Sequence, residues 1–199
     1  MKGTGVAKQS DPRLIERFLD GEIAAFEELV RRYEGPLVHF LMRYVRDPML
    51  AEELFQETFV RVYKKAASFD LDRHFKTWLY TIALNLARTA IRRRRTREIS
   101  LEADYGGEKE TSLRETLPAD IHSPEDLAAG SELAREIEKA VQSLTEKQRE
   151  VFILYQYDGC SYEEISKITK RPPGTVKSQM HYAIKELRRK LEHIKNYEL

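Results

Sequence analysis

The feature of this sequence that most constrains its fold is the helical spacing of its apolar residues. Between residues 11 and 95 they recur at steps of three and four, which places them on one face of each of three successive helices. Three amphipathic helices can close a small bundle, so we predict a helical domain over residues 11–95, preceded by a disordered tail at residues 1–10. The three stripes consist of Phe26, Leu29, Val30, Tyr33, Leu37, Phe40, Leu41 and Tyr44; Ala51, Leu54, Phe55, Thr58, Phe59 and Val62; and Trp78, Leu79, Ile82, Ala83, Leu86 and Ile91.

The helical pattern stops between residues 96 and 130, where acidic residues outnumber basic ones. Gly106-Gly107, Pro118 and Pro124 interrupt any helix there, so we predict a flexible acidic linker. Helical spacing resumes beyond it, which predicts a second helical domain over residues 131–199. The expected fold is therefore all-α, with two small helical domains joined by a linker.

Short polar signals mark where several helices should begin. Asp11-Pro12, Asp47-Pro48 and Ser123-Pro124 each pair a capping side chain with a proline in the first turn. Residues 145–148 (TEKQ) and 161–164 (SYEE) read as capping boxes, in which the first and fourth residues satisfy each other's backbone N–H groups. Pro36 falls inside the first stripe, where it predicts either a kink or a new turn.

Composition excludes several classes of protein. The single cysteine, Cys160, rules out an internal disulfide and a multi-cysteine zinc site. No apolar run approaches the roughly 20 residues that span a membrane, and residues 1–10 lack the apolar core of a signal peptide. We therefore expect a cytoplasmic protein without direct membrane insertion. A Gly-rich phosphate loop, a metal cluster and a nucleophile–base set are all missing from the sequence, which disfavours an enzyme and predicts no cofactor.

The second domain carries the pattern of a helix-turn-helix. A short helix after Ser161, a tight turn at residues 169–174 (TKRPPG) and a longer final helix follow one another. The second helix of such a motif lies in the major groove and presents its first turns to base edges. On it, Lys177, Ser178, His181 and Tyr182 share the outward face, while Arg171 and Thr175 are placed for phosphates. An ordinary helical hairpin with a solvated basic face remains the alternative.

The first domain has two polar stripes and a loop with aromatic residues. Glu52, Glu53, Gln56 and Glu57 form an acidic stripe, which in most proteins is only a solvated helix face. Asn85, Arg88, Thr89 and Arg92 form a second stripe that runs into four consecutive arginines, suited to phosphates or simply to the helix dipole. Residues 68–75 (SFDLDRHF) place aromatic rings in a loop beside these cations, as a single-strand binding platform requires.

Five segments resemble a known family. Residues 51–63 (AEELFQETFVRVY) and 75–87 (FKTWLYTIALNLA) resemble region two of the extracytoplasmic-function (ECF) sigma factors, a group within the sigma-70 family of RNA polymerase sigma factors. Residues 144–152 (LTEKQREVF), 161–165 (SYEEI) and 174–178 (GTVKS) resemble the family's region four. Both matches stand in the family's order with a linker between them.

The resemblance implies a function and a role for each segment. The chain would bind core RNA polymerase and direct initiation at promoter DNA, and a protein anti-sigma factor, which is frequently membrane-bound in this family, would hold it inactive. The linker would thread toward the active-site cleft and the RNA exit channel. The implied core-polymerase contacts are Glu53, Leu54, Phe55, Gln56 and Glu57; the −10 contacts are Phe69, Asp70, Leu71, Asp72, Arg73, His74, Phe75, Asn85, Arg88, Thr89 and Arg92; and the −35 contacts are Arg171, Thr175, Lys177, Ser178, His181 and Tyr182.

The chain also departs from the family pattern, which leaves its promoter sequence open. Many relatives have arginine where this chain has Gln179 and Tyr182, some have an amide at Thr89, and Pro172-Pro173 stiffens the turn. The main rival interpretation is a helix-turn-helix regulator whose first domain senses a ligand or dimerises. Promoter binding that depends on core polymerase would separate the two.

Overall fold

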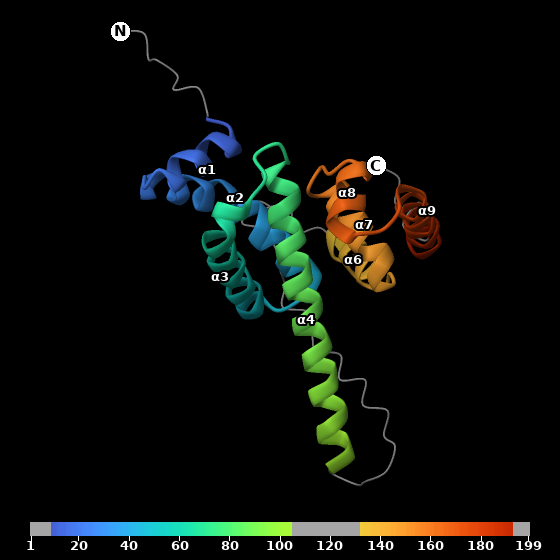
Figure 1. The fold of residues 1–199 in the computed structure, drawn as a ribbon. Helices are drawn as coiled ribbons and strands as arrows, with labels where there is room; N and C mark the ends of the chain where they lie inside the picture. Colours follow the sequence, from blue (N-terminus) through green and yellow to red (C-terminus); the bar gives the residue numbers. More distant parts are fainter. Residues whose placement is uncertain (1–8, 105–131, 193–199) are drawn as a thin grey trace.

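A computed structural model describes residues 9–104 and 132–192, all of whose regular elements are helices (Figure 1). The first helical unit contains α1 to α4, and the second contains α6 to α9. The all-α, two-unit architecture expected from the sequence is confirmed. The elements are α1 (Asp11–Leu19), α2 (Ile23–Val45), α3 (Pro48–Lys65), the short 3₁₀ turn η1 (Ala66–Ser68), α4 (Phe75–Asp104), α6 (Glu132–Gln142), α7 (Glu146–Gln156), α8 (Tyr162–Thr169) and α9 (Pro173–Lys190).

Most of the predicted helix starts are confirmed. Asp47 accepts a hydrogen bond from the backbone N–H of Leu50 at 3.1 Å, and complete capping boxes open α7 at Thr145 and α8 at Ser161. Each box satisfies backbone donors that would otherwise be left unpaired at the helix end. These signals work because they act within a single turn. The Ser123-Pro124 signal lies outside the described residues.

The prediction that Asp11 caps the first helix is wrong. Ser10 occupies the N-cap position of α1, and Asp11 stands in the first helical turn. The Asp11 carboxylate instead accepts hydrogen bonds from Arg32 and Tyr33 of α2. It therefore ties α1 to α2, and the tertiary partners outweigh the local capping bond.

The core of the first unit is built on α2, which packs against α1, α3 and α4. Its apolar stripe is buried as predicted, with Leu29, Leu37 and Leu41 fully enclosed. Pro36 lies inside α2 and does not end it, since the helix continues to Val45. A single continuous helix thus runs through the centre of the unit.

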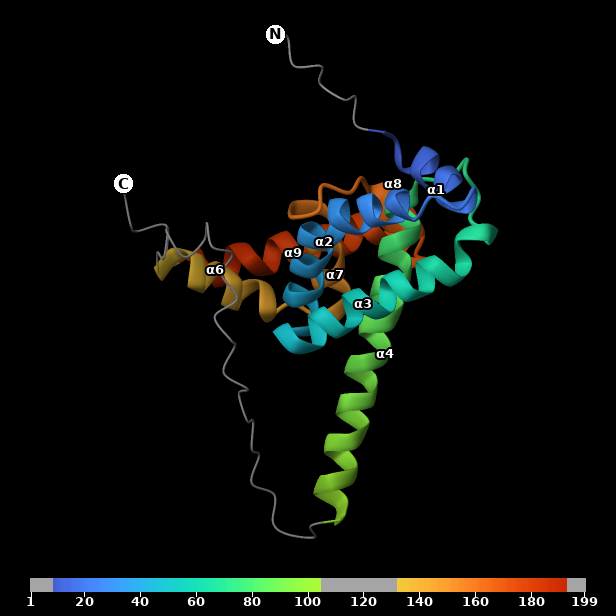
Figure 2. The same ribbon diagram turned by 90° about the vertical axis from the view of Figure 1, so that its left-hand side faces the viewer.

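Helix α4 is longer than predicted. It continues to Asp104, past the expected domain boundary at residue 95, and its C-terminal half projects away from the rest of the molecule (Figures 1 and 2). Residues 92–104 (RRRRTREISLEAD) contain no glycine or proline and are rich in good helix formers. The predicted linker therefore begins within a helix, and its remainder, residues 105–130, lies outside the described residues.

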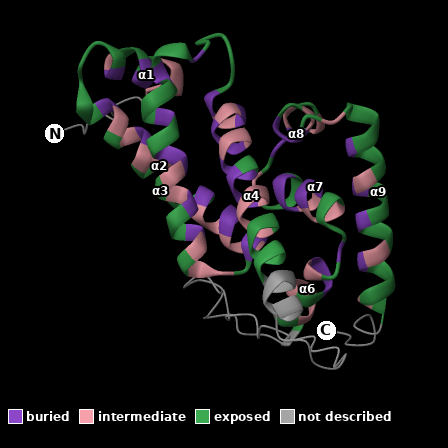
Figure 3. Ribbon diagram, turned by 60° about the horizontal axis from the view of Figure 1, so that its bottom comes forward, coloured by how far each residue is buried: buried purple, intermediate pink, exposed green. Residues whose placement is uncertain are grey.

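The two units pack directly against each other. Helix α7 packs against α2 and helix α8 packs against α4, and buried segments occur on α4, α7 and α8 alike (Figure 3). Val151, Ile153 and Leu154 of α7 belong to the same continuous apolar cluster as the core of the first unit. The sequence predicts two domains joined by a flexible linker, and the structure adds a shared apolar core that no sequence pattern indicates.

Candidate nucleic-acid interface

Helix α3 presents the acidic stripe predicted to contact core polymerase. Glu53 and Gln56 are exposed and Glu57 is half-exposed, where it forms an ion pair with Arg61 at 2.8 Å. Leu54, which the family resemblance also included, is buried in the core, and half-buried Phe55 packs on the ring of Phe59 with centroids 5.1 Å apart. The polar members of the stripe are therefore the accessible ones.

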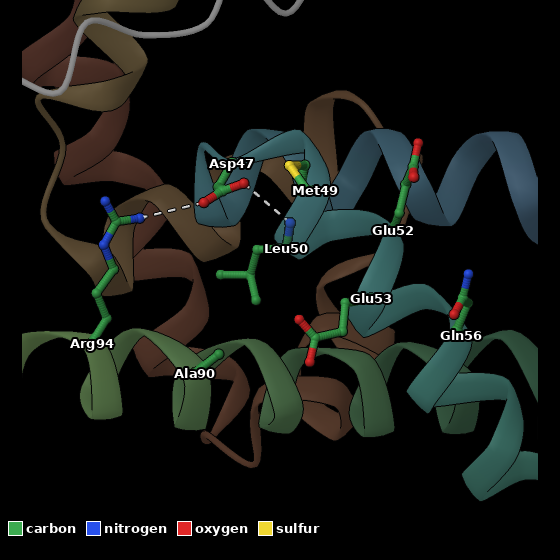
Figure 4. A pocket seen from close by; sticks show the side chains of 8 residues that line it. All are labelled: Asp47, Met49, Leu50, Glu52, Glu53, Gln56, Ala90 and Arg94. Carbon is green, nitrogen blue, oxygen red and sulfur yellow. Dashed lines mark hydrogen bonds and ion pairs between the residues drawn. The ribbon is translucent and has the colours of Figure 1, made fainter.

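A surface hollow of about 660 Å³ lies between the start of α3 and the middle of α4 (Figure 4). Leu50 and Glu53 point toward the part of α4 that carries Ala90 and Arg94. The Arg94 guanidinium is 3.6 Å from the Asp47 carboxylate, which closes one end of the hollow. Met49, also on its rim, is 83% exposed and adds an apolar edge. The acidic stripe thus borders a recess with both polar and apolar walls.

The loop between η1 and α4 does not present its rings to solvent, contrary to the prediction. Phe69 and Phe75 are buried and pack on each other at 5.8 Å. Phe69 also lies 4.7 Å from the ring of Trp78. Burying these rings removes their apolar surface from water, which stabilises the fold; rings held outward on the loop would remain exposed to water. These aromatic side chains therefore form the floor of the loop, and neither phenylalanine is free to stack on a base.

The exposed part of this loop is polar. Asp70, Asp72, Arg73 and His74 are exposed, and Leu71 is at the edge of exposure. Arg73 forms an ion pair with Asp70 at 3.0 Å, and the Asp72 N–H donates to the Asp70 carboxylate at 3.1 Å. The loop is therefore a turn organised by Asp70 above an aromatic base.

The stripe along α4 divides into accessible and engaged residues. Asn85 and Arg92 are exposed, and Thr89 is half-exposed with its hydroxyl donating to the Asn85 carbonyl at 2.8 Å. Arg88 is different, because its guanidinium forms two parallel hydrogen bonds of 2.7 Å to Glu150 in α7. The hydrogen bond to Glu150 raises the pKa of Arg88. This predicted DNA contact is bound to the other helical unit.

Helices α8 and α9 form the predicted helix-turn-helix. Lys170 ends α8 in the left-handed conformation, with φ 56°, and α9 begins three residues later at Pro173. Four side chains predicted to contact the −35 element are exposed together on the first turns of α9, with Tyr182 53% exposed. They are Lys177, Ser178, His181 and Tyr182. Thr175, beside them, is also exposed.

Arg171, predicted to contact phosphate, is not on the open surface. Its side chain is 18% exposed and lies 2.7 Å from the Glu150 carboxylate. Ser166 fixes its backbone, accepting the Arg171 N–H at its carbonyl and donating its hydroxyl to the Arg171 carbonyl at 2.6 Å. Arg171 is thus separated from the exposed face of α9 and directed at the same carboxylate as Arg88.

Glu150 is the residue that sequence reasoning missed. It is fully buried, and its carboxylate binds Arg88, Arg171 and the hydroxyl of Tyr44, which donates at 2.9 Å. Two arginines and one hydroxyl supply hydrogen bonds or ion pairs to both oxygens of this buried carboxylate. Its spacing of three and four residues from Ile153 and Leu154 is a signal that could have identified it, because a carboxylate on an apolar helix face requires partners.

Asp158, after α7, forms a second polar contact between the units. Its carboxylate accepts from the Tyr80 hydroxyl at 2.8 Å, its carbonyl accepts from Lys76, and the neighbouring Tyr157 ring lies 4.1 Å from the Arg43 guanidinium. Burial raises the pKa of Asp158 to about 6, and the Tyr80 hydrogen bond with the nearby cations counteracts part of that rise. Sequence reasoning did not identify this contact either.

The described residues offer neither a metal-ion cluster nor a membrane-spanning helix. Within residues 9–104 and 132–192, no three His, Cys, Asp or Glu side chains are grouped so that they could hold a metal ion. Among the helices described, none has both the length and the apolar character needed to cross a membrane.

Comparisons with known proteins match both units. The family model for sigma-70 region 2 matches residues 29–97, and the model for sigma-70 region 4 matches residues 134–187. The ECF RNA polymerase sigma factor SigW of Bacillus subtilis is 33% identical over 180 residues, covering 90% of this chain and 96% of the relative. The ECF RNA polymerase sigma-E factor of Escherichia coli is 33% identical over 183 residues, covering 92% of this chain and 95% of the relative.

Solved structures agree in fold. The sigma factor RpoE of Bartonella quintana, in complex with the anti-sigma factor NepR, is 28% identical, with a TM-score of 0.64 over 84% of this chain and 96% of that chain. Both units, in the same order, are therefore found together in a solved relative. The chain belongs to the ECF sigma factors, within the sigma-70 family of RNA polymerase sigma factors.

Proposed function

We propose that this sigma factor directs promoter-specific transcription initiation through three surfaces. Helix α3 would bind core polymerase, α9 would read the −35 duplex, and α4 with the preceding loop would hold the melted −10 strand. The observation that carries this proposal is the exposed face of α9, where Lys177, Ser178, His181 and Tyr182 lie together at the start of the second helix of a helix-turn-helix.

The −35 contacts of α9 can be tested base by base. A lost base contact costs about 1–3 kcal/mol and relaxes preference at one position. We expect Lys177→Ala and His181→Ala, in the presence of core polymerase, each to loosen preference at a different −35 base pair. The matched control is Lys167→Ala on α8, an exposed lysine outside this face. Unchanged base preference in both α9 variants would reject the assignment.

The core-docking role of α3 rests on its exposed carboxylates. Reversing both charges in a Glu53→Lys, Glu57→Lys variant should abolish holoenzyme formation, because neither side chain belongs to the core of the fold. Glu27 and Glu34 on α2 are also exposed, so the same double reversal there is the matched control. Gel filtration with core polymerase measures assembly, and circular dichroism verifies the fold. Co-elution of the α3 variant with core would contradict the proposal.

The −10 role of the first unit now rests on polar groups, since Phe69 and Phe75 are buried. Asn85 is exposed and can hydrogen-bond an extruded base, while Arg92 can hold a phosphate without selecting sequence. In the holoenzyme, Asn85→Ala should erase base preference in a single-stranded −10 oligonucleotide. Arg92→Ala should weaken binding to every oligonucleotide alike. Equal preference in wild type and Asn85→Ala would remove Asn85 from the proposed site.

Regulation by a protein partner is the remaining part of the proposal. The Bartonella quintana relative was solved with an anti-sigma factor, and we infer that an anti-sigma factor also inhibits this chain. Run-off transcription with purified core polymerase tests both statements. With core polymerase and no further protein, the chain should support transcription from its promoter. An anti-sigma factor that co-purifies with the chain, added in stoichiometric amount, should suppress that transcription.

A further inference from the structure

The contact between the two helical units is built around a buried carboxylate. Glu150 has no exposed surface, and it receives Arg88 and Tyr44 from the first unit and Arg171 from the second. The Arg88 contact is bidentate, with both bonds at 2.7 Å. Bidentate arginine–carboxylate pairs are among the strongest charge-assisted hydrogen bonds in proteins. The Arg88–Glu150 pair is therefore a substantial part of the contact between the two units.

A second polar contact holds the same two units together. The Tyr80 hydroxyl donates to the Asp158 carboxylate at 2.8 Å, and Lys76 donates to the Asp158 carbonyl. Tyr44 and Tyr80 each have a ring buried in the first unit and a hydroxyl that reaches the second. We call the five residues Tyr44, Tyr80, Arg88, Glu150 and Asp158 the interdomain latch.

The latch affects one part of the proposed −10 surface and leaves the rest open. Asn85 and Arg92 are exposed in the closed arrangement. Arg88 lies between them in sequence, but its side chain is only 27% exposed and directs two of its nitrogens at Glu150. A phosphate would need those same donors. Arg88 can therefore serve Glu150 or the nucleic acid backbone, but not both.

We propose that the free protein is held closed by the interdomain latch, which withholds Arg88 from the −10 strand until the two units separate. This inference rests on the proposed −10 role of α4. Because strand and Glu150 compete for one guanidinium, strand binding and opening are thermodynamically coupled. Binding of the strand raises the equilibrium constant for opening, and opening raises the affinity for the strand by the same factor.

The test weakens the latch without touching a DNA contact, because the Arg88–Glu150 pair itself is left unchanged. A Tyr44→Phe, Tyr80→Phe variant keeps both buried rings and loses only the two hydroxyls that cross between the units. Tyr33→Phe is the matched control, because its hydroxyl donates to Asp11 within the first unit. Small-angle X-ray scattering of the full chain measures opening. Titration with a single-stranded −10 oligonucleotide, at several salt concentrations, measures strand affinity.

We expect the double variant to have a larger radius of gyration than wild type and Tyr33→Phe. It should bind the strand at least tenfold more tightly, and the slope of log K against log salt should steepen by about 0.7, the value for one additional phosphate contact on a single strand. Adding the strand to wild type should enlarge its radius of gyration, which tests the coupling with no substitution at all.

Two results would overturn the inference, and they differ in what else they reject. If the strand binds all three proteins with the same affinity and salt slope and leaves the size of wild type unchanged, the latch has no role while the −10 surface stands. If none of the three binds the strand, even though the double variant is expanded, the proposed −10 role fails together with the withholding of Arg88.

Discussion

Replacing Glu150 by glutamine should destabilise both helical units, although the residue belongs to only one of them. The substitution keeps the size of the side chain and one carbonyl oxygen, but it removes the charge that Arg88 and Arg171 share. Arg171 then remains 18% exposed with no anion beside it, and Arg88 loses its bidentate partner. The first unit loses its ion pair with the second unit, and the second unit retains the largely buried Arg171 cation.

The expected loss is about 3 kcal/mol in the free energy of unfolding. Removing one member of a buried ion pair costs roughly 3–5 kcal/mol, because the other charge is left uncompensated. The lower end applies here, since the side chain of Arg88 is 27% exposed and water can solvate part of it. The hydrogen bond from Tyr44 is retained, because the remaining carbonyl oxygen of glutamine can accept it.

The single tryptophan makes the assay selective. Trp78 lies in α4 of the first unit, so its fluorescence in urea reports unfolding of that unit, while circular dichroism reports all the helices. Glu150→Gln should lower the urea midpoint seen by both probes. Glu163→Gln, which removes an exposed carboxylate from α8, is the control and should leave both midpoints unchanged.

A Glu150→Gln variant whose Trp78 midpoint equals that of wild type would refute this reasoning. It would mean that the first unit gains no stability from its contact with α7. A loss below about 1 kcal/mol by circular dichroism would further place the pair in the range of solvent-exposed ion pairs, and the burial of Glu150 would then have no energetic consequence.

Three further substitutions test separate parts of the structure. Phe69→Ala should lower the stability of the first unit by about 3 kcal/mol, measured by Trp78 fluorescence in urea, because the ring is core rather than a stacking surface; an unchanged midpoint would contradict its burial. Asp158→Asn should remove a pH dependence of stability, because the folded protein holds the Asp158 proton up to about pH 6. The free energy of unfolding of wild type, relative to the variant, should therefore fall by about 3 kcal/mol as pH rises from about 4 to about 6. Parallel pH profiles of the two proteins would exclude the effect. Thr145→Ala should cost about 1 kcal/mol through the lost capping box of α7, and a cost near zero in thermal unfolding would show that the cap is not needed.

Local features of the fold could be predicted from the sequence because their causes are local. The capping boxes at Thr145 and Ser161 each involve residues three positions apart, and both form as predicted. The end of α4 was misplaced for a related reason. The loss of apolar spacing and the excess of acidic residues after residue 95 predict a linker, yet residues 96–104 contain no helix breaker, and the helix continues to Asp104.

The predicted site was less accessible to sequence reasoning, since burial is a tertiary property. Exposure of Lys177, Ser178, His181 and Tyr182 follows from the periodicity of one helix, which the sequence contains. Whether Phe69 in a loop points outward or inward depends on Trp78 and Phe75, which surround it from another element. A ring in a loop is therefore an ambiguous signal until its neighbours are known.

The contact between the two units was the feature least predictable from the sequence. Arg88 and Glu150 are 62 positions apart, and Tyr44 and Glu150 are 106 apart, so no periodicity within a helix could pair them. Arg88 was predicted as a phosphate ligand because a basic helix face has that meaning when nothing covers it. A guanidinium that suits a phosphate also suits a carboxylate, since both offer two oxygens to its planar fork. The same chemistry that recommends Arg88 for nucleic acid therefore makes it a ligand for Glu150, and the separation of the two units decides which anion it binds.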